Sequence, residues 1–182
     1  IHRQSLYDIS DLRKPKVFAA EKKLKKINIK TKIKSYKIKL NQSNYKKIFD
    51  KYDYIVDGSD NFDTKFLIND ISKKTKKFLV TGAISKFDGH IFVFDFRIKK
   101  TPCIRCFFQE EKITDNVFNC EYDGILGTVA GVIGTIQANE ILKKILTIGK
   151  NLSGYVMIID LLNLNFRKVK LNKIKNARDI KI

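Results

Sequence analysis

The stretch YDYIVDGSDNFDTKF, residues 52–66, decides the fold class of this chain. It contains a short apolar run, residues 54–56, of the kind found in buried parallel strands. The run ends in the sequence DGSDN, residues 57–61, which combines turn-forming and helix-capping residue types. A helical pattern follows over residues 61–74, with apolar positions three to five residues apart. Strand, polar turn and helix together predict half of a βαβ unit.

Two carboxylates, Asp57 and Asp60, fall directly after the predicted strand. In open α/β sheets, ligands bind at the carboxyl ends of the parallel strands. We therefore expect these side chains to lie where a nucleotide or its metal binds. The alternative is that Asp57 and Ser59 only cap the helix, which is the ordinary role of these residue types.

The remaining pattern predicts an α/β domain with a mixed sheet. Helices are expected over residues 15–28, 41–52 and 124–146, and a partly exposed strand over 29–40. Further strands are expected over residues 78–84, 91–96, 154–159 and 166–171. The pair Asp88-Gly89 is a strong hairpin signal. The sheet is thus expected to be parallel in its first half and antiparallel in its second. Small residues at positions 127, 130, 131 and 134 indicate a helix that packs closely on a sheet or on another subunit.

The length of 182 residues and a hydrophobic content of 43% indicate one compact domain, expected over residues 1–171, followed by a charged tail over 172–182. No apolar run reaches the length of a membrane span. The chain contains three cysteines, an odd number, which argues against a disulfide framework and favours a reducing, cytoplasmic compartment. The first residue is Ile1 and not Met, so the absence of a visible signal peptide carries little weight.

The formal net charge is +18, which raises the hypothesis of a nucleic-acid-binding module. The lysines, however, are scattered over helices, strands and tail alike, and aromatic residues are not interleaved with them as on a single-strand binding platform. The charge therefore indicates a compositional bias, and nucleic acid is not an expected partner.

An ordered set of short motifs resembles the ThiF/MoeB/HesA family of adenylylating enzymes. The set covers residues 1–171 and comprises Arg3-Gln4, Pro15-Lys16-Val17, Asp57-x-x-Asp60-Asn61, Gly82-Ala83, Asp88-Gly89, Pro102-Cys103-x-x-Cys106, Cys120 and the run GVIGTIQA from Gly131. The resemblance implies a Rossmann-like three-layer fold. It also implies ATP-dependent activation of the C-terminal glycine of a ubiquitin-like sulfur-carrier protein that ends in Gly-Gly. A homodimer is implied as well.

The resemblance assigns roles to five positions. Asp60 matches the aspartate that binds Mg²⁺, and Asn61 follows it in the nucleotide pocket; the alternative is that Asp60 and Asn61 only cap the helix. Arg3 and Lys16 match the cations that contact and stabilise the phosphates of ATP; the alternative is that both are solvated surface charges. Cys120 matches a cysteine that some members link covalently to the carrier, and a plain loop cysteine is the alternative.

Cys103-x-x-Cys106 matches half of the family's four-cysteine structural zinc site. A closed zinc site needs four ligands, and the second pair is absent near residues 175–178, where it is expected. A pair of reduced thiols without zinc is therefore the favoured interpretation.

Two departures from the family pattern bear on function. The phosphate-cradling glycine-rich turn and the acidic residue that holds the ribose lie before Ile1, so the domain is expected to lack its first βαβ portion. Lys65 stands where an arginine is usual, which keeps the charge and loses bidentate geometry.

The leading hypothesis is an adenylyltransferase of a sulfur carrier for thiamine or molybdopterin biosynthesis, with peptide activation also open. The alternative is a non-catalytic relative that binds a carrier or partner without ATP turnover.

Overall fold

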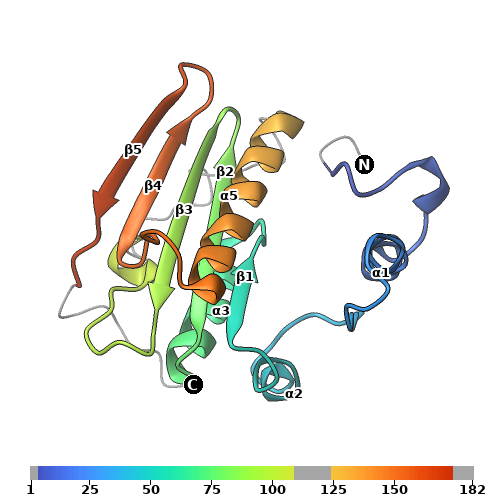
Figure 1. Ribbon diagram of the computed structural model, residues 1–182, viewed down its shortest axis with the longest axis horizontal. Helices are drawn as coiled ribbons and strands as arrows, with labels where there is room; N and C mark the ends of the chain where they lie inside the picture. Colours follow the sequence, from blue (N-terminus) through green and yellow to red (C-terminus); the bar gives the residue numbers. More distant parts are fainter. Residues whose placement is uncertain (1–3, 109–123, 174–182) are drawn as a thin grey trace. The chain divides into compact units, whose positions relative to one another are not determined.

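The computed structural model describes residues 4–108 and 124–173 (Figure 1). Contacts divide the chain into an N-terminal unit, Ile1–Leu40, and a C-terminal unit, Asn41–Ile182. That these two units form the single domain expected over residues 1–171 stays a prediction.

The N-terminal unit is built from a short 3-10 helix and one α-helix. The 3-10 helix η1, Ile9–Asp11, is capped by the Asp8 side chain, which also accepts a hydrogen bond of 2.6 Å from Lys23 Nζ. The helix α1, Lys16–Ile27, begins directly after Pro15. Pro15 is therefore the N-cap residue, one position earlier in the helix than the sequence pattern predicts.

The strand expected over residues 29–40 is not formed, and this prediction is wrong. The segment runs as a loop, which starts where Asn28 Oδ1 accepts a hydrogen bond from the Lys30 amide. A strand needs a partner for its backbone hydrogen bonds. The described sheet lies entirely within residues 54–170, so the alternating residues of 29–40 have no ladder to join.

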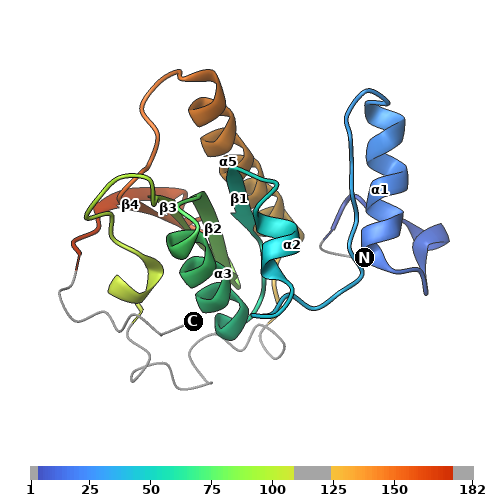
Figure 2. The ribbon, with the colours of Figure 1, turned by 90° about the horizontal axis from the view of Figure 1, so that it is seen from below.

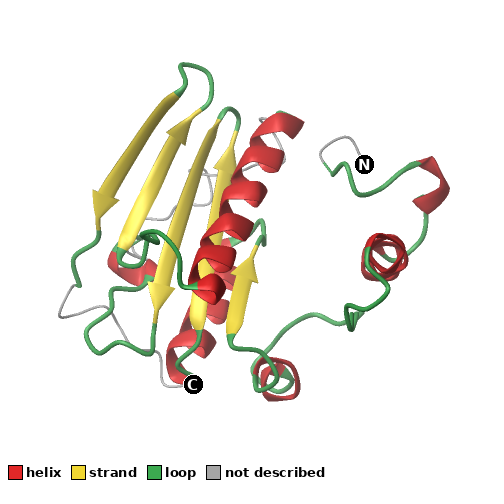
Figure 3. Ribbon diagram, viewed as in Figure 1, coloured by secondary structure: helices red, strands yellow, loops and turns green. Residues whose placement is uncertain are grey.

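The C-terminal unit contains a five-stranded mixed sheet, which confirms the predicted fold class (Figure 3). Its strands follow chain order: β1 Tyr54–Asp57, β2 Phe78–Ser85, β3 Asp88–Asp95, β4 Tyr155–Asp160 and β5 Asn165–Lys170. β1 and β2 are parallel, and every later pair is antiparallel. The helix α3, Phe62–Lys74, connects β1 to β2, as a parallel pair requires.

Two helices cover opposite faces of this sheet, α3 on one side and α5, Gly127–Leu146, on the other (Figure 2). A short helix α2, Tyr45–Phe49, precedes β1, and a 3-10 helix η2, Ile104–Cys106, follows β3. Because both faces are covered, β2 and β3 are largely buried: each of the first five residues of β2 is inaccessible to solvent or nearly so. β5, at the edge of the sheet, is exposed at every residue.

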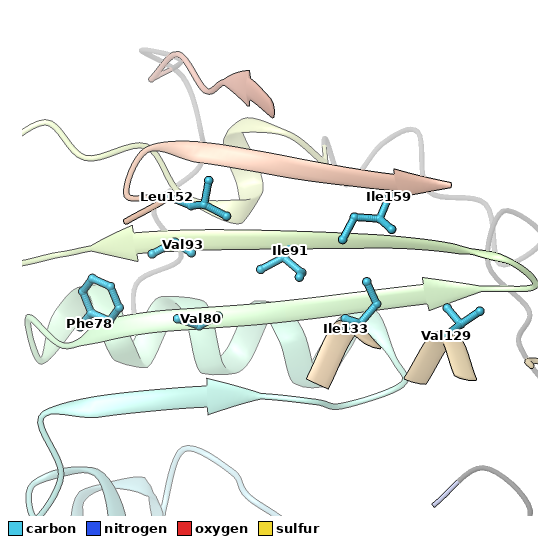
Figure 4. Packing of buried hydrophobic residues seen from close by; sticks show 8 residues of the cluster. All are labelled: Phe78, Val80, Ile91, Val93, Val129, Ile133, Leu152 and Ile159. Atoms are coloured by element: carbon cyan, nitrogen blue, oxygen red, sulfur yellow. The ribbon is translucent and has the colours of Figure 1, made fainter. Parts of the chain in front are cut away.

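The main hydrophobic core lies between the sheet and α5 (Figure 4). Its fully or nearly fully buried members are Phe78, Val80, Ile91, Val93, Val129, Ile133, Leu152 and Ile159. The opposite face of β3 is aromatic, and Phe92 makes ring contacts with Phe94, Phe107 and Phe108. The two apolar faces of β3 make it the centre of the sheet.

The hairpin between β2 and β3 is confirmed, but its turn is not at Asp88-Gly89. Ser85 pairs with Asp88, so the two-residue loop is Lys86-Phe87, and Lys86 adopts a positive φ of 39°. Gly89 lies within β3 instead. A Cβ at this position would stand 2.2 Å from Ile133 Cδ1 of α5, so the missing side chain makes room for the helix. Gly89 therefore serves helix packing and not chain reversal.

The close approach expected at the small residues of α5 is not made by Gly131 and Gly134. An added Cβ at either glycine would meet no atom within 4 Å among the described residues. Both glycines are exposed on the side of α5 that faces away from the sheet. The sheet glycines, not the helix glycines, allow α5 to pack closely.

None of the helices in the described ranges combines the length and the hydropathy that a membrane span requires.

Because Gly89 has no room for a side chain, Gly89→Ala is expected to lower the free energy of unfolding by about 1–3 kcal/mol. Ile133→Ala removes both atoms that the new methyl group would strike, Cδ1 at 2.2 Å and Cγ1 at 2.5 Å. The double variant should therefore lose less than the sum of the two single losses in urea denaturation.

Gly58→Ala is the matched control, since an added Cβ there would meet no described atom within 4 Å and Gly58 does not have a positive φ. It should change the free energy of unfolding by no more than about 0.5 kcal/mol. Equal effects of the two alanine substitutions, or strict additivity of Gly89→Ala with Ile133→Ala, would contradict this account of the packing.

Candidate functional site

The candidate site is the turn of residues 58–61, which connects the carboxyl end of β1 to the start of α3. β1 and β2 are parallel and in register, so Asp57 lies beside Thr81 at the same edge of the sheet. The sequence predicts ligand residues at this edge, and the structure places both Asp57 and Asp60 there.

The structure separates the two carboxylates by burial. The Asp57 side chain is only 1% exposed, and its two oxygens accept hydrogen bonds from within the protein. Ser59 donates its amide and its hydroxyl to Oδ1 at 2.8 and 2.6 Å. Lys65 Nζ donates to Oδ2 at 3.3 Å, and the Thr81 hydroxyl donates to the same oxygen. The expectation that Asp57 faces a ligand is therefore wrong, because its carboxylate is engaged inside the fold.

Asp60 is exposed, and its Oδ1 accepts a hydrogen bond of 3.1 Å from Asn61 Nδ2. Asn61 is the N-cap of α3, and its side-chain oxygen accepts the Thr64 amide at 2.9 Å. The capping alternative is thus confirmed at Asn61, and it is wrong for Asp57 and Ser59, which do not cap the helix.

The exposed carboxylate of Asp60 fits a magnesium ion carried by a nucleotide. Mg²⁺ keeps most of its waters and usually takes one or two protein carboxylates together with substrate phosphates. Within residues 4–108 and 124–173, no cluster of three or more potential ligands forms a cage for a metal alone. Asp60 therefore suits a shared metal site, completed by phosphate oxygens and water, and not a resident one.

Lys16, the proposed phosphate contact, lies in the N-terminal unit. It is the first residue of α1 and is exposed, and its Nζ donates a hydrogen bond of 2.8 Å to Gln4 Oε1. A cation at a helix N-terminus opposes the helix dipole, so this position does not serve helix stability. Arg3 and Cys120, the other residues to which the resemblance gives roles, lie outside the described residues.

The thiols of Cys103 and Cys106 lie close together, with their sulfurs 3.7 Å apart. The hydrogen bond to Cys106, and then burial, raise the pKa of the Cys103 thiol well above its usual range. No third His, Cys, Asp or Glu of the described ranges joins the pair. Two thiols do not make a closed zinc site, and the favoured interpretation of a zinc-free pair stays a prediction.

Contacts to α3 fix the loop that carries these cysteines. The Ile104 amide donates to Asn69 Oδ1 at 3.1 Å. Arg105 Nε and Nη2 donate hydrogen bonds to the two carboxylate oxygens of Asp70, and the guanidinium lies 4.4 Å from the centre of the Phe66 ring. An ion pair and a stacked guanidinium therefore hold this loop against α3.

His90 stays apart from these groups in the described structure. Its ring stacks at 6.3 Å on Phe92, and burial lowers its pKa. His90 is thus a neutral, packed histidine near neutral pH and does not complete the cysteine pair.

Sequence reasoning missed two residues that shape the site, Gln137 and Thr81. Gln137 Nε2 of α5 donates to the Asp57 carbonyl oxygen at 2.9 Å, and the Thr81 hydroxyl donates to the Asp57 carboxylate. Lys65 was noted only as a replacement for arginine, and its Nζ donates to the Gly82 carbonyl at 2.5 Å. The available signal was a polar residue inside an otherwise buried pattern, as with Thr81 in the run FLVTGAI.

Comparisons with known proteins identify relatives over almost the whole chain. The chain is 37% identical over 176 residues to the sulfur carrier protein adenylyltransferase of Thermus thermophilus, covering 95% of this chain and 65% of that protein. It is 35% identical to the adenylyltransferase and sulfurtransferase MOCS3 of Xenopus laevis, covering 97% of this chain and 39% of that protein. A probable molybdopterin-synthase adenylyltransferase of Pyropia yezoensis is also 35% identical, over 94% of this chain and 45% of that protein. The chain thus spans between about two fifths and two thirds of the length of these relatives.

Solved structures show the same fold at low sequence identity. The crystal structure of E. coli MccB with ATP superimposes with a TM-score of 0.79 at 15% identity, over 97% of this chain and 53% of that one. PaaA superimposes with a TM-score of 0.70 at 15% identity, over 93% of this chain and 59% of that one. Because residues 1–179 also match the ThiF family, the resemblance found in the motifs is confirmed, and the chain belongs to the ThiF family.

Proposed function

We propose that the protein containing this chain adenylylates the C-terminal glycine of a ubiquitin-like sulfur-carrier protein. The observation that carries the proposal is the exposed Asp60 at the carboxyl end of β1, in a chain whose relatives are named adenylyltransferases. In the proposed reaction, a carboxylate oxygen of the carrier attacks the α-phosphorus of ATP. The bond to the β-phosphate breaks, and pyrophosphate leaves.

The chemistry of this reaction matches the residue types of the site. The attacking carboxylate is ionised at neutral pH, so no general base is required. The requirement is electrostatic, because negative charge must be neutralised on the phosphates. Bound Mg²⁺ supplies Lewis-acid polarisation of phosphate oxygens there. Asp60 is the residue that would hold it, since its carboxylate reaches solvent while that of Asp57 does not.

The roles of the remaining residues rest on the resemblance. We assign Lys16 and Arg3 to the phosphates and Asn61 to the nucleotide pocket. Asn61 must then combine that role with its capping bond to Thr64. Cys120 is proposed as the residue that links covalently to the carrier.

The class of carrier stays open between two pathways. One relative is named for sulfur carrier proteins in general and another for molybdopterin synthase. Thiamine-type and molybdopterin-type carriers that end in Gly-Gly are therefore the two substrates to compare.

We further propose that the protein forms a homodimer through the outer face of α5. On this face Gly131, Gly134 and Ala138 are exposed, and Leu142 and Ile145 continue the same stripe with more than half of their surface exposed. The stripe lies opposite the buried residues of α5, because its members recur every three or four positions. Small residues let two backbones approach closely, and a two-fold interface uses the same patch twice.

Asp60→Ala is expected to lower carrier-dependent ATP–pyrophosphate exchange roughly 100-fold, because the metal-assisted neutralisation of the phosphates is lost. The assay uses the full-length protein with each carrier type. Asp63→Ala is the matched control, since Asp63 is also an exposed aspartate of this segment, in the first turn of α3. It should leave the exchange rate within about twofold of the wild type.

No exchange by the wild type with any carrier ending in Gly-Gly would overturn the adenylyltransferase proposal. The non-catalytic relative, which binds a carrier without ATP turnover, would then be the remaining interpretation. Equal losses in the two variants would instead remove the metal role from Asp60.

Leu142→Glu combined with Ile145→Glu is expected to convert the dimer to a monomer in sedimentation velocity, since four charges would face one another across the two-fold axis. Leu162→Glu is the control, because Leu162 is equally apolar and exposed but lies in the turn between β4 and β5. A wild-type monomer, or a dimer that survives the α5 substitutions, would contradict this interface.

A further inference from the structure

The turn that presents Asp60 is held by hydrogen bonds and not by packing. Gly58 and Asp60 are both exposed, and an added Cβ at Gly58 would meet no described atom within 4 Å. The turn therefore owes its conformation to its two ends. Asp57 lies at one end and Asn61 at the other, and Asp60 stands between them.

Lys65 reaches both ends of this turn. Its backbone amide donates the first helical hydrogen bond of α3, 3.2 Å to the Asn61 carbonyl. Its side chain turns back along the helix, and Nζ donates to the Asp57 carboxylate at 3.3 Å. One residue thus ties the last residue of β1 to the cap of α3, with the proposed metal ligand between them.

Neighbouring elements fix the position of this ion pair. Lys65 Nζ also donates to the Gly82 carbonyl of β2 at 2.5 Å. Gln137 Nε2 of α5 donates a hydrogen bond to the Asp57 backbone oxygen. The Gln137 side chain also leaves no space for a Cβ at Gly82. The pair therefore sits where β1, β2, α3 and α5 converge.

Stability alone does not account for this arrangement. The side chains of Asp57 and Lys65 are 1% and 5% exposed, so both charges have lost their water. The desolvation of a buried pair often cancels its attraction, and apolar residues of the same volume serve stability as well. The ion pair instead orients the turn. It fixes the Asp57 carboxylate, which accepts hydrogen bonds from the Ser59 amide and hydroxyl and so sets the backbone path of the turn.

We propose that Lys65 is a positioning residue for Asp60, acting through the Asp57 carboxylate and the turn of residues 58–61. Thr81 supports the same carboxylate from β2. The inference rests on the proposed role of Asp60 toward Mg²⁺ and nucleotide, and it assigns Lys65 no contact with either.

The test compares Lys65→Met with Lys65→Arg and with the control Lys144→Met. Lys144 is matched to Lys65 because it also pairs with a buried aspartate, at 3.0 Å from Asp95. Asp95 lies opposite Phe78 at the start of β2, away from the turn. Lys65→Arg keeps the charge and the donors and should behave as the wild type does.

The first measurement is amide hydrogen exchange of the free protein by NMR, which needs no ligand. In Lys65→Met, the Ser59 and Lys65 amides should exchange at least about 10-fold faster than in the wild type, because local opening of the turn becomes easier. In Lys144→Met, these amides should exchange at the wild-type rate.

The second measurement is the Mg²⁺ concentration at half-maximal ATP–pyrophosphate exchange by the full-length protein. Lys65→Met should raise it about 10-fold, as loss of support around a metal ligand does elsewhere. The carrier concentration at half-maximal rate should stay unchanged. A general loss of folded protein would lower the maximal rate and leave both half-maximal concentrations unchanged, so a rise for Mg²⁺ alone separates the positioning role from a loss of folded protein.

Equal amide exchange in Lys65→Met and Lys144→Met would overturn the positioning role, as would failure of Lys65→Arg to restore protection. A wild type without exchange activity would overturn the proposed function alone, and the amide measurement would still decide this inference. If Lys65→Met does not fold, Thr81→Val takes its place, because it removes one donor and leaves the ion pair intact. Its Ser59 amide should exchange about threefold faster, and an unchanged rate would overturn the proposal.

Discussion

The close contact between Ile133 and Gly89 is the constraint on which the rest of the C-terminal unit depends. An added Cβ at Gly89 would lie 2.2 Å from Ile133 Cδ1, so α5 can reach the sheet only because β3 has no side chain there. That contact fixes the rotation and the height of α5 on the sheet. Gln137 lies one helical turn after Ile133, and its side chain packs against Gly82, a second sheet position where there is no room for a Cβ. From there Gln137 Nε2 donates a hydrogen bond to the Asp57 carbonyl oxygen. The same helix placement thus fills the hydrophobic core and fixes the end of β1 where the candidate site begins.

The large positive charge of the chain has a structural use that is separate from any ligand. The three buried carboxylates of the described residues are Asp57, Asp95 and Glu140, and each has a cationic neighbour: Lys65, Arg97 with Lys144, and Lys143, respectively. A buried carboxylate without a partner carries a large desolvation cost, so an abundance of lysine makes such positions easy to compensate. Part of the lysine content therefore serves to neutralise buried carboxylates, and the expectation that nucleic acid is not a partner stays a prediction.

The parts of the fold that sequence reasoning predicted are those whose signal is local. β1, α3 and the order of the later strands follow from runs and periods that a single segment contains. The strand prediction for residues 29–40 failed because an alternating apolar–polar pattern forms a strand only when a partner strand is within reach. The presence of a partner strand depends on the whole chain and not on the segment itself. The turn of the β2–β3 hairpin was misplaced for a related reason. Glycine serves chain reversal and close packing alike, and the sequence around Gly89 does not show that a helix from residues 127–146 needs the space.

A local sequence pattern also does not distinguish the roles of the two aspartates of the candidate site. Asp57 and Asp60 are three residues apart in a single polar run, and their side chains are chemically identical. Their roles diverge only because the last residue of a strand points into the layer between sheet and helix, while a residue of the following turn points to solvent. Asp57, surrounded by the donors of Ser59, Lys65 and Thr81, is fixed in place and shielded from ligands. Asp60 keeps its access to solvent, so the turn can present its carboxylate to an incoming cation. In the proposed arrangement, the buried acid holds the exposed acid in position as a consequence of the strand–turn–helix geometry. Burial, not residue type, then determines which of the two aspartates a ligand can reach.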